Sequence, residues 1–130
     1  MSYLWVGLGG AIGSMLRFWL GGLISNTKIG SQFPLGTMVI NITGSLVIGI
    51  FYTMTTPESR FNPKWSHLIT QLLILGLCGG YTTFSSFSLQ TLNLARDGQW
   101  LYAGLNIGLS VVLCLVGVWT GFVLGEMINK

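Results

Sequence analysis

Charged side chains are scarce in this chain: they make up 7% of its 130 residues, and only three of them are acidic. An ordinary soluble domain has about 25% charged residues. No acidic residue lies well inside a long apolar stretch, since Glu58 and Asp97 are in short polar segments and Glu126 is close to the C-terminus. Proton-coupled exporters need a carboxylate within the membrane to carry the proton, so this absence argues against that class of protein.

Cysteine is also rare, and no nucleotide-binding motif is present. Cys78 and Cys114 both fall inside apolar stretches, where neither has the partners that a disulfide framework or a zinc site requires. We interpret them as small apolar side chains between helices. The sequence has no phosphate-binding loop motif either, which argues against transport driven by ATP.

Apolar residues are abundant instead, at 51% of the chain, and four long stretches stand out at residues 3–25, 35–56, 66–93 and 100–128. Each reaches the roughly 20 residues that a helix needs to cross a bilayer. The first stretch lacks a basic leader, so we expect a membrane span rather than a signal peptide. The pattern predicts an all-α membrane protein, with residues 1–130 forming a single domain of four transmembrane helices.

The basic residues are divided almost evenly between the two sides that four crossings define. One side holds Arg60, Lys64 and Lys130, and the other holds Lys28 and Arg96. Orientation normally follows an excess of Lys and Arg on the cytoplasmic side, so this balance predicts insertion in both directions. Two oppositely inserted copies can form an antiparallel, dual-topology homodimer. A single orientation set by other features is the alternative.

Small and polar residues recur every four positions along the first span, at Gly9, Gly13, Arg17 and Gly21, and so share one helix face. Glycines at this spacing let a neighbouring helix approach closely. Arg17 is different, because a charged guanidinium at membrane depth costs at least about 2.5–3.5 kcal/mol. We expect Arg17 to face either a vestibule for anions or the lipid headgroups.

The second and fourth spans carry similar polar faces, with Thr37, Asn41 and Ser45 in one and Asn106, Ser110 and Cys114 in the other. The Asn41 amide offers two N–H donors that cannot be left bare in hydrocarbon. Asn41 must therefore bond a neighbouring helix or line a polar pathway, and both interpretations are open.

The third span contains the most informative run, since residues 76–88 read G-L-C-G-G-Y-T-T-F-S-S-F-S. The Gly79-Gly80 pair predicts a helix broken in mid-membrane, which would free carbonyl oxygens that need partners. Without carboxylates nearby, a monovalent cation such as Na⁺ suits these oxygens better than Mg²⁺ or a transition metal. Close helix packing is the other explanation for the glycines.

Two phenylalanines and six hydroxyl groups, that of Tyr81 included, follow the glycine pair. Phe84 and Phe87 are three residues apart and share a face if the helix resumes. Aromatic rings have an electropositive edge that attracts small anions, and hydroxyl groups can replace part of an anion's hydration shell. A plain packing role for the two rings is the simpler alternative.

Three motifs resemble the Fluc, or CrcB-like, family of bacterial fluoride channels over essentially the whole chain: G-G-A-I-G-S-M-L-R at Gly9–Arg17, G-T-M-V-I-N at Gly36–Asn41, and the run at Gly76–Ser88. The resemblance implies a passive, selective channel of the bacterial inner membrane, not an enzyme, that exports fluoride down its electrochemical gradient and gives fluoride resistance. It also implies a dual-topology homodimer with two pores and a structural Na⁺ at the interface. The expected partners are fluoride, the lipid bilayer and a second copy, and not nucleic acid.

The same resemblance implies roles for individual residues. The Na⁺ would be held by the backbone carbonyls of Gly79 and Thr82. The fluoride pathway would include Phe84, Phe87, Asn41, Ser85, Ser86 and, near the entrance, Arg17. Two positions depart from the family pattern: Gln90 stands where Glu is common, and Cys114 where Ser is expected. The competing interpretation, a small multidrug-type antiporter of four helices, is disfavoured because its first-helix carboxylate is absent.

Overall fold

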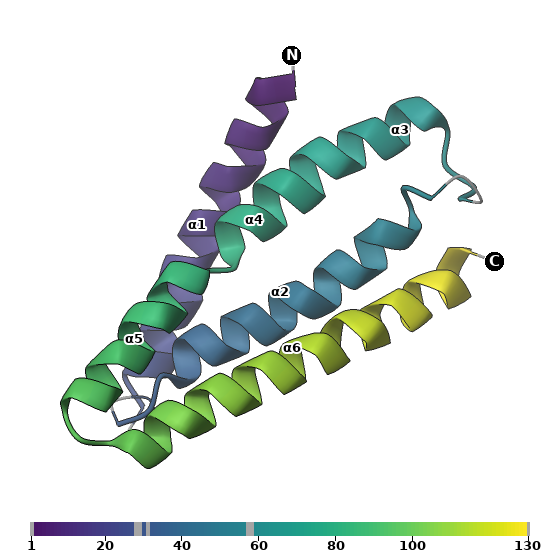
Figure 1. Ribbon diagram of the computed structural model, residues 1–130. Helices are drawn as coiled ribbons and strands as arrows, with labels where there is room; N and C mark the ends of the chain where they lie inside the picture. The colour runs from purple at the N-terminus through teal and green to yellow at the C-terminus, as the bar shows by residue number, and fades with distance from the viewer. Residues whose placement is uncertain (1, 28–29, 31, 57–58, 130) are drawn as a thin grey trace.

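The computed structural model describes residues 2–27, 30, 32–56 and 59–129, and the regular structure within these ranges is entirely helical. Four helical stretches are long and apolar enough to cross a membrane: α1 (Ser2–Ser25), α2 (Leu35–Thr53), the segment Pro63–Arg96 and α6 (Trp100–Asn129). They run back and forth, as Figure 1 shows. The expected all-α, multi-pass membrane protein is confirmed.

The third span is assembled from several helical pieces. It begins with α3 (Pro63–Leu68), where the Asn62 side chain caps the helix by accepting the Lys64 N–H at 3.0 Å. A π-helical stretch, η1 (Ile69–Cys78), follows and leads into the short α4 (Gly79–Tyr81). After a break the span resumes as α5 (Phe84–Arg96). A π-helix of ten residues is long, because most occur as single-turn bulges.

The break predicted in this span is confirmed, but it lies three residues beyond Gly79. Gly79 is helical (φ −64°, ψ −38°), whereas Thr82 (φ −79°, ψ 157°) and Thr83 (φ −151°, ψ 111°) are extended. Gly80 serves packing instead, since a Cβ on it would lie 2.5 Å from the Gly10 carbonyl oxygen. Threonine accepts the extended backbone readily, and Thr83 then acts as the N-cap of α5.

The helices pack in two pairs that meet at the break. In Figure 1, α2 lies along α6, while α1 crosses η1 and α4. Glycines make both contacts close: a Cβ on Gly49 would lie 2.8 Å from the Phe122 nitrogen, and one on Gly13 would lie 2.8 Å from the Tyr81 nitrogen. The predicted small-residue faces therefore bring backbones together. Large apolar side chains such as Phe18, which is 86% exposed, point outward, as expected for a helix surface that faces lipid.

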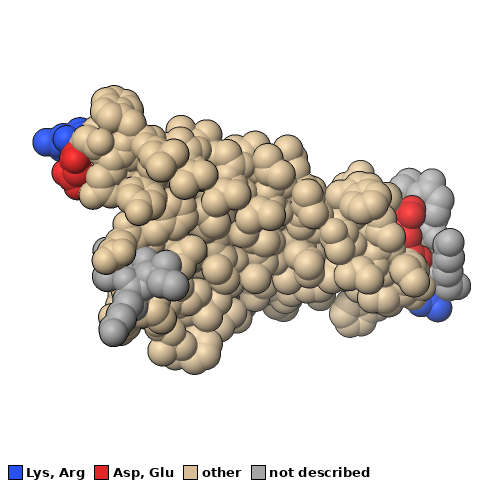
Figure 2. Space-filling model, turned by 90° about the horizontal axis from the view of Figure 1, so that it is seen from below, with Lys and Arg blue, Asp and Glu red and all other residues tan. Residues whose placement is uncertain are grey.

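Charged residues gather at the two ends of the molecule, as the face shown in Figure 2 makes plain. At one end, Arg60 donates from its guanidinium to the Ile128 carbonyl, and the Asn129 amide donates to the Thr53 carbonyl at 3.2 Å. These bonds tie the last turn of α6 to the end of α2 and the segment that follows. Two residues of the charge count, Lys28 and Lys130, lie outside the described residues, so dual insertion stays a prediction.

Candidate functional site

The Asn41 side chain connects α2 to the break in the third span. Its Nδ2 donates to the Thr83 carbonyl oxygen at 3.1 Å, and its Oδ1 accepts the Thr83 N–H at 2.8 Å. An asparagine amide has two N–H donors, and Thr83 uses one of them. Asn41 therefore links two helices, and it also lines the cavity beside the break. The two interpretations left open by the sequence are compatible in this geometry.

The cavity has a volume of about 310 Å³ and lies between α2, the break and α6. Its polar and aromatic lining consists of Asn41, Ser45, Thr82, Thr83, Phe84, Phe87, Ser110 and Cys114. Among the described residues that line it, none is charged. The polar faces of the second and fourth spans thus meet the central run of the third span around one space.

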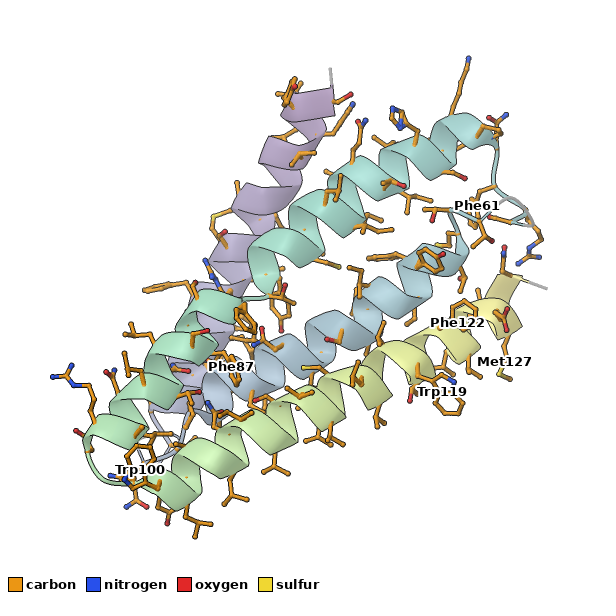
Figure 3. All side chains as sticks on the ribbon, viewed as in Figure 1. Phe61, Phe87, Trp100, Trp119, Phe122 and Met127 are labelled. Carbon is orange, nitrogen blue, oxygen red and sulfur yellow. The ribbon has the colours of Figure 1, made fainter. Side chains whose placement is uncertain are left out.

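Phe84 and Phe87 stand next to each other at this cavity. Their ring centroids are 5.4 Å apart and the ring planes are inclined by 47°. Phe87 extends from the side of α5 that faces α2 and α6 (Figure 3). Phe84 is 78% exposed on the single chain. The electropositive edge of an aromatic ring is the part that attracts a small anion.

Thr83 is the centre of the hydroxyl network, a role that the sequence does not single out among six hydroxyl residues. Thr83 is only 7% exposed. Its Oγ1 donates to Ser86 Oγ at 3.0 Å, accepts the Ser86 N–H at 3.2 Å, and lies 3.2 Å from Ser85 Oγ. A threonine immediately before the helix resumes is an N-cap signal that the sequence does contain. Ser85 and Ser86 are held beside Thr83 and are not part of the cavity lining.

The break removes the helical donors of the carbonyl groups that precede it, among them those of Gly79 and Thr82. In a continuous α-helix these carbonyls would accept the N–H groups of Thr83 and Ser86, four residues on. Here the Thr83 N–H donates to Asn41 Oδ1 at 2.8 Å and the Ser86 N–H donates to Thr83 Oγ1 at 3.2 Å. Unwound backbone carbonyls are the oxygen ligands that membrane proteins use for Na⁺. The donor chemistry at this point therefore fits a monovalent cation.

Two neighbouring carbonyls of the same segment, those of Cys78 and Gly80, are occupied. The Cys78 carbonyl accepts both the Thr82 N–H at 2.9 Å and the Thr82 hydroxyl at 2.8 Å. The Gly80 carbonyl accepts the Ser14 hydroxyl at 3.4 Å. Gly79 itself is exposed on the single chain.

Arg17 stands apart from this group of residues. It lies on α1 and is half-buried, and the described part of the chain contains no hydrogen bond or ion pair to its guanidinium. It is not part of the cavity lining. The structure therefore brings Asn41, Phe84 and Phe87 together but does not bring Arg17 to them within one chain.

A second polar contact joins α5 to α6 near the cavity. Asn106 is 1% exposed, and its Nδ2 donates to Thr91 Oγ1 at 2.8 Å. Ser110, one turn along α6, donates to Asn106 Oδ1 at 3.5 Å and also lines the cavity. Thr91 was not among the residues that the sequence singles out, since a lone threonine beyond the motif carries no distinguishing signal.

The two departures from the family pattern lie in different places. Cys114 lines the cavity that Asn41 and Phe87 share. Gln90 lines a separate, more polar cavity of about 600 Å³ near the turn between α5 and α6. The amide oxygen of Gln90 is buried and has no hydrogen-bond partner among the described residues. The presence of glutamine at position 90 therefore affects the cavity near the turn between α5 and α6, and not the cavity at the break.

These features define a class of protein: a small, multi-pass helical membrane protein with an uncharged polar cavity beside a broken helix. A family model described as "CrcB-like protein, Camphor Resistance (CrcB)" matches residues 4–122. The chain belongs to this CrcB-like family.

Similar proteins align along the full length. A protein of Rhodospirillum rubrum named "Fluoride-specific ion channel FluC" is 58% identical over 100% of this chain and 98% of its own. Proteins with the same name from Methylocella silvestris and Paramagnetospirillum magneticum are 49% and 50% identical, over 100% of this chain and 97% and 99% of theirs. The family resemblance inferred from the motifs is confirmed.

Proposed function

We propose that this protein is a passive, fluoride-specific ion channel. The observation that carries the proposal is the 58% identity, along the whole chain, to a protein named a fluoride-specific ion channel. The cavity beside the break supports it, because its lining offers neutral donors and aromatic rings and its described residues include no fixed charge that would hold an anion.

Selectivity for fluoride follows from the kind of donors present. Fluoride is small and tightly hydrated, so it gains more than chloride from amide and hydroxyl donors in a narrow path. Asn41 supplies the amide N–H that Thr83 leaves free, Ser45 supplies a hydroxyl group, and Phe84 and Phe87 supply ring edges. Because none of these groups is charged, each contact is weak enough for the ion to leave.

A structural Na⁺ at the break is part of the proposal. The Gly79 and Thr82 carbonyls would hold it, since their helical donors are diverted to Asn41 and to Thr83 Oγ1. Gly79 is exposed on the single chain, which suits a site shared between two copies. The ion would fix the geometry of the broken helix and would take no part in conduction.

The assembly we propose is an antiparallel, dual-topology homodimer with two pores. The near-even division of Lys and Arg between the two sides supports insertion in both directions. The 78% exposure of Phe84, next to the cavity, supports a second copy that covers this face. Each copy would contribute its own broken helix, so that two equivalent pathways result.

The direction of flow needs no energy source in this proposal. An inside-negative membrane potential drives an anion outward with about 2.3 kcal/mol per charge per 100 mV. Fluoride that enters as neutral HF and ionises in the cytoplasm would leave by this route. Export down the electrochemical gradient would then give fluoride resistance.

The test is ion efflux from liposomes that contain the purified protein, followed with a fluoride electrode. We expect fluoride to leave quickly when a potential is set, and chloride to stay behind. Equal loss of chloride or bromide, or no loss of fluoride, would contradict the proposal. Proton-driven uptake of an organic cation in the same liposomes would instead support the antiporter.

A further inference from the structure

The three residues at the break are each seated on α2 by a different contact. Tyr81 OH lies 2.9 Å from Thr43 Oγ1. The Thr82 methyl group packs against Gly44, where an added Cβ would overlap with it. The backbone of Thr83 pairs with the Asn41 amide. Residues 81, 82 and 83 thus rest on residues 43, 44 and 41.

The direction of the contact between Tyr81 and Thr43 follows from the proton count. A threonine hydroxyl has one hydrogen and two acceptor positions. Thr43 Oγ1 lies 2.8 Å from the Val39 carbonyl and 3.1 Å from the Ile40 carbonyl, so its hydrogen is directed back along α2. Tyr81 OH must then be the donor to Thr43 Oγ1. The two hydroxyl groups form a chain that ends on a carbonyl, an arrangement in which each bond strengthens the next.

Tyr81 occupies a position from which it can set the direction of the freed carbonyls. It is the last helical residue before the break, and it lies between Gly79 and Thr82 in the chain. Thr82 has an extended backbone, so the plane of its carbonyl depends on how the end of α4 is held. A ring anchored at its far end to another helix restricts rotation of that segment.

We propose that Thr43 and Tyr81 are positioning residues that hold the Gly79 and Thr82 carbonyls in the orientation that receives the monovalent cation. This inference rests on the cation site of the proposed function, and it adds two side chains that touch neither the cation nor the cavity. Thr43 is exposed and Tyr81 is half-buried on the single chain, so neither is held by dense core packing.

The experiment measures the unfolding midpoint of the full-length protein in detergent as Na⁺ replaces N-methylglucamine at constant ionic strength. Tyr81→Phe and Thr43→Val each remove the bond with little change of volume. We expect each to raise the Na⁺ concentration for half-maximal stabilisation roughly fivefold, which corresponds to the loss of one hydrogen bond. Thr43→Ser keeps the hydroxyl and should retain the Na⁺ response of the unchanged protein.

Matched controls separate positioning from general loss of stability. Thr120→Val removes a hydroxyl that bonds back to its own helix at 2.8 Å, as Thr43 does, but on α6. Tyr52→Phe removes a phenol hydroxyl at the far end of α2. Both should leave the Na⁺ response unchanged. The double variant Thr43→Val with Tyr81→Phe should raise the Na⁺ concentration for half-maximal stabilisation no further than either single change does, because both changes remove the same bond.

The outcomes distinguish this inference from the function on which it rests. An unchanged Na⁺ response in both Tyr81→Phe and Thr43→Val, with the Thr120 and Tyr52 controls also unchanged, overturns the positioning role. No Na⁺ response in the unchanged protein overturns the cation site and this inference together, while fluoride efflux tests the channel independently. If Thr43→Val does not fold, Tyr81→Phe, which lacks a single oxygen atom, decides the matter alone.

Discussion

The Asn41 amide and the Thr83 peptide group exchange two hydrogen bonds, N–H to Oδ1 at 2.8 Å and Nδ2 to O at 3.1 Å. This is the pattern by which paired β-strand residues bond, with a side chain in place of the second strand. A residue whose backbone has left the helix thus has both polar groups of its peptide paired within a membrane span. The break is stable because α2 supplies the partner that the third span has lost.

Asn41→Asp should disrupt this pairing on one side only. Aspartate still accepts the Thr83 N–H but cannot donate to the Thr83 carbonyl, and its negative charge repels a passing anion. We expect fluoride efflux to fall at least about tenfold, the effect of roughly 1.4 kcal/mol on a barrier. Asn62→Asp is the matched control, since aspartate also caps α3 well. Undiminished efflux through Asn41→Asp would remove Asn41 from the pathway.

Phe84→Ile and Phe87→Ile test the aromatic edges. Isoleucine keeps the side chain apolar and large but has no electropositive ring edge. Fluoride therefore loses an attraction and meets an apolar surface instead. We expect several-fold slower efflux from liposomes while the oligomer elutes unchanged in size-exclusion chromatography. Phe61→Ile, in the segment between α2 and α3, should conduct normally. Normal efflux through both cavity variants would show that the rings serve packing alone.

Gly80→Ala tests the close approach of α1 to α4. The new methyl group would lie 2.5 Å from the Gly10 carbonyl oxygen and 2.9 Å from its Cα, so the two backbones must separate. We expect a loss of about 1–3 kcal/mol in the free energy of unfolding, measured in mixed detergent micelles. Gly108→Ala on α6, where nothing lies within 4 Å, should be neutral or stabilising. Equal effects at both sites would contradict the packing role.

The bond between Asn106 and Thr91 should appear as coupling in a double-mutant cycle. Asn106→Leu and Thr91→Val each break the 2.8 Å contact between α5 and α6. Hydrogen bonds between membrane helices couple by about 0.6 kcal/mol on average and by up to about 1.7 kcal/mol. Because Asn106 is 1% exposed, we expect a value above that average. Additive single effects would mean that the two side chains stabilise their helices separately.

The sequence predicts the helices well because their signals are local. Apolar runs set the spans, Pro34 and Pro63 stand at helix starts, and the turn after α5 uses Gly98 at φ 74°. The predicted stretches 35–56 and 100–128 correspond to helices at Leu35–Thr53 and Trp100–Asn129. The four-residue spacing likewise predicted polar faces on the second and fourth spans, and in the structure both faces line one cavity.

The position of the break was not predictable from the same signals. Glycine favours non-helical backbone, so the sequence directs attention to Gly79 and Gly80. The extended residues are instead Thr82 and Thr83, because Asn41, 42 residues earlier, bonds the Thr83 backbone. Such a contact depends on how α2 lies against the third span, which local propensity does not report. The roles of Ser85, Ser86 and Arg17 in ion passage stay predictions.

The π-helical winding of Ile69–Cys78 affects the direction in which the break faces relative to α2. A π-turn holds about one residue more than an α-turn, so the winding of this stretch sets the direction in which the residues after it face. If the same residues wound as ordinary α-helix, at about 100° per residue, everything downstream would be rotated about the helix axis. Thr83 would turn away from Asn41, and the phenylalanines would turn with it. The winding of this stretch therefore sets the angular alignment of the candidate site with α2.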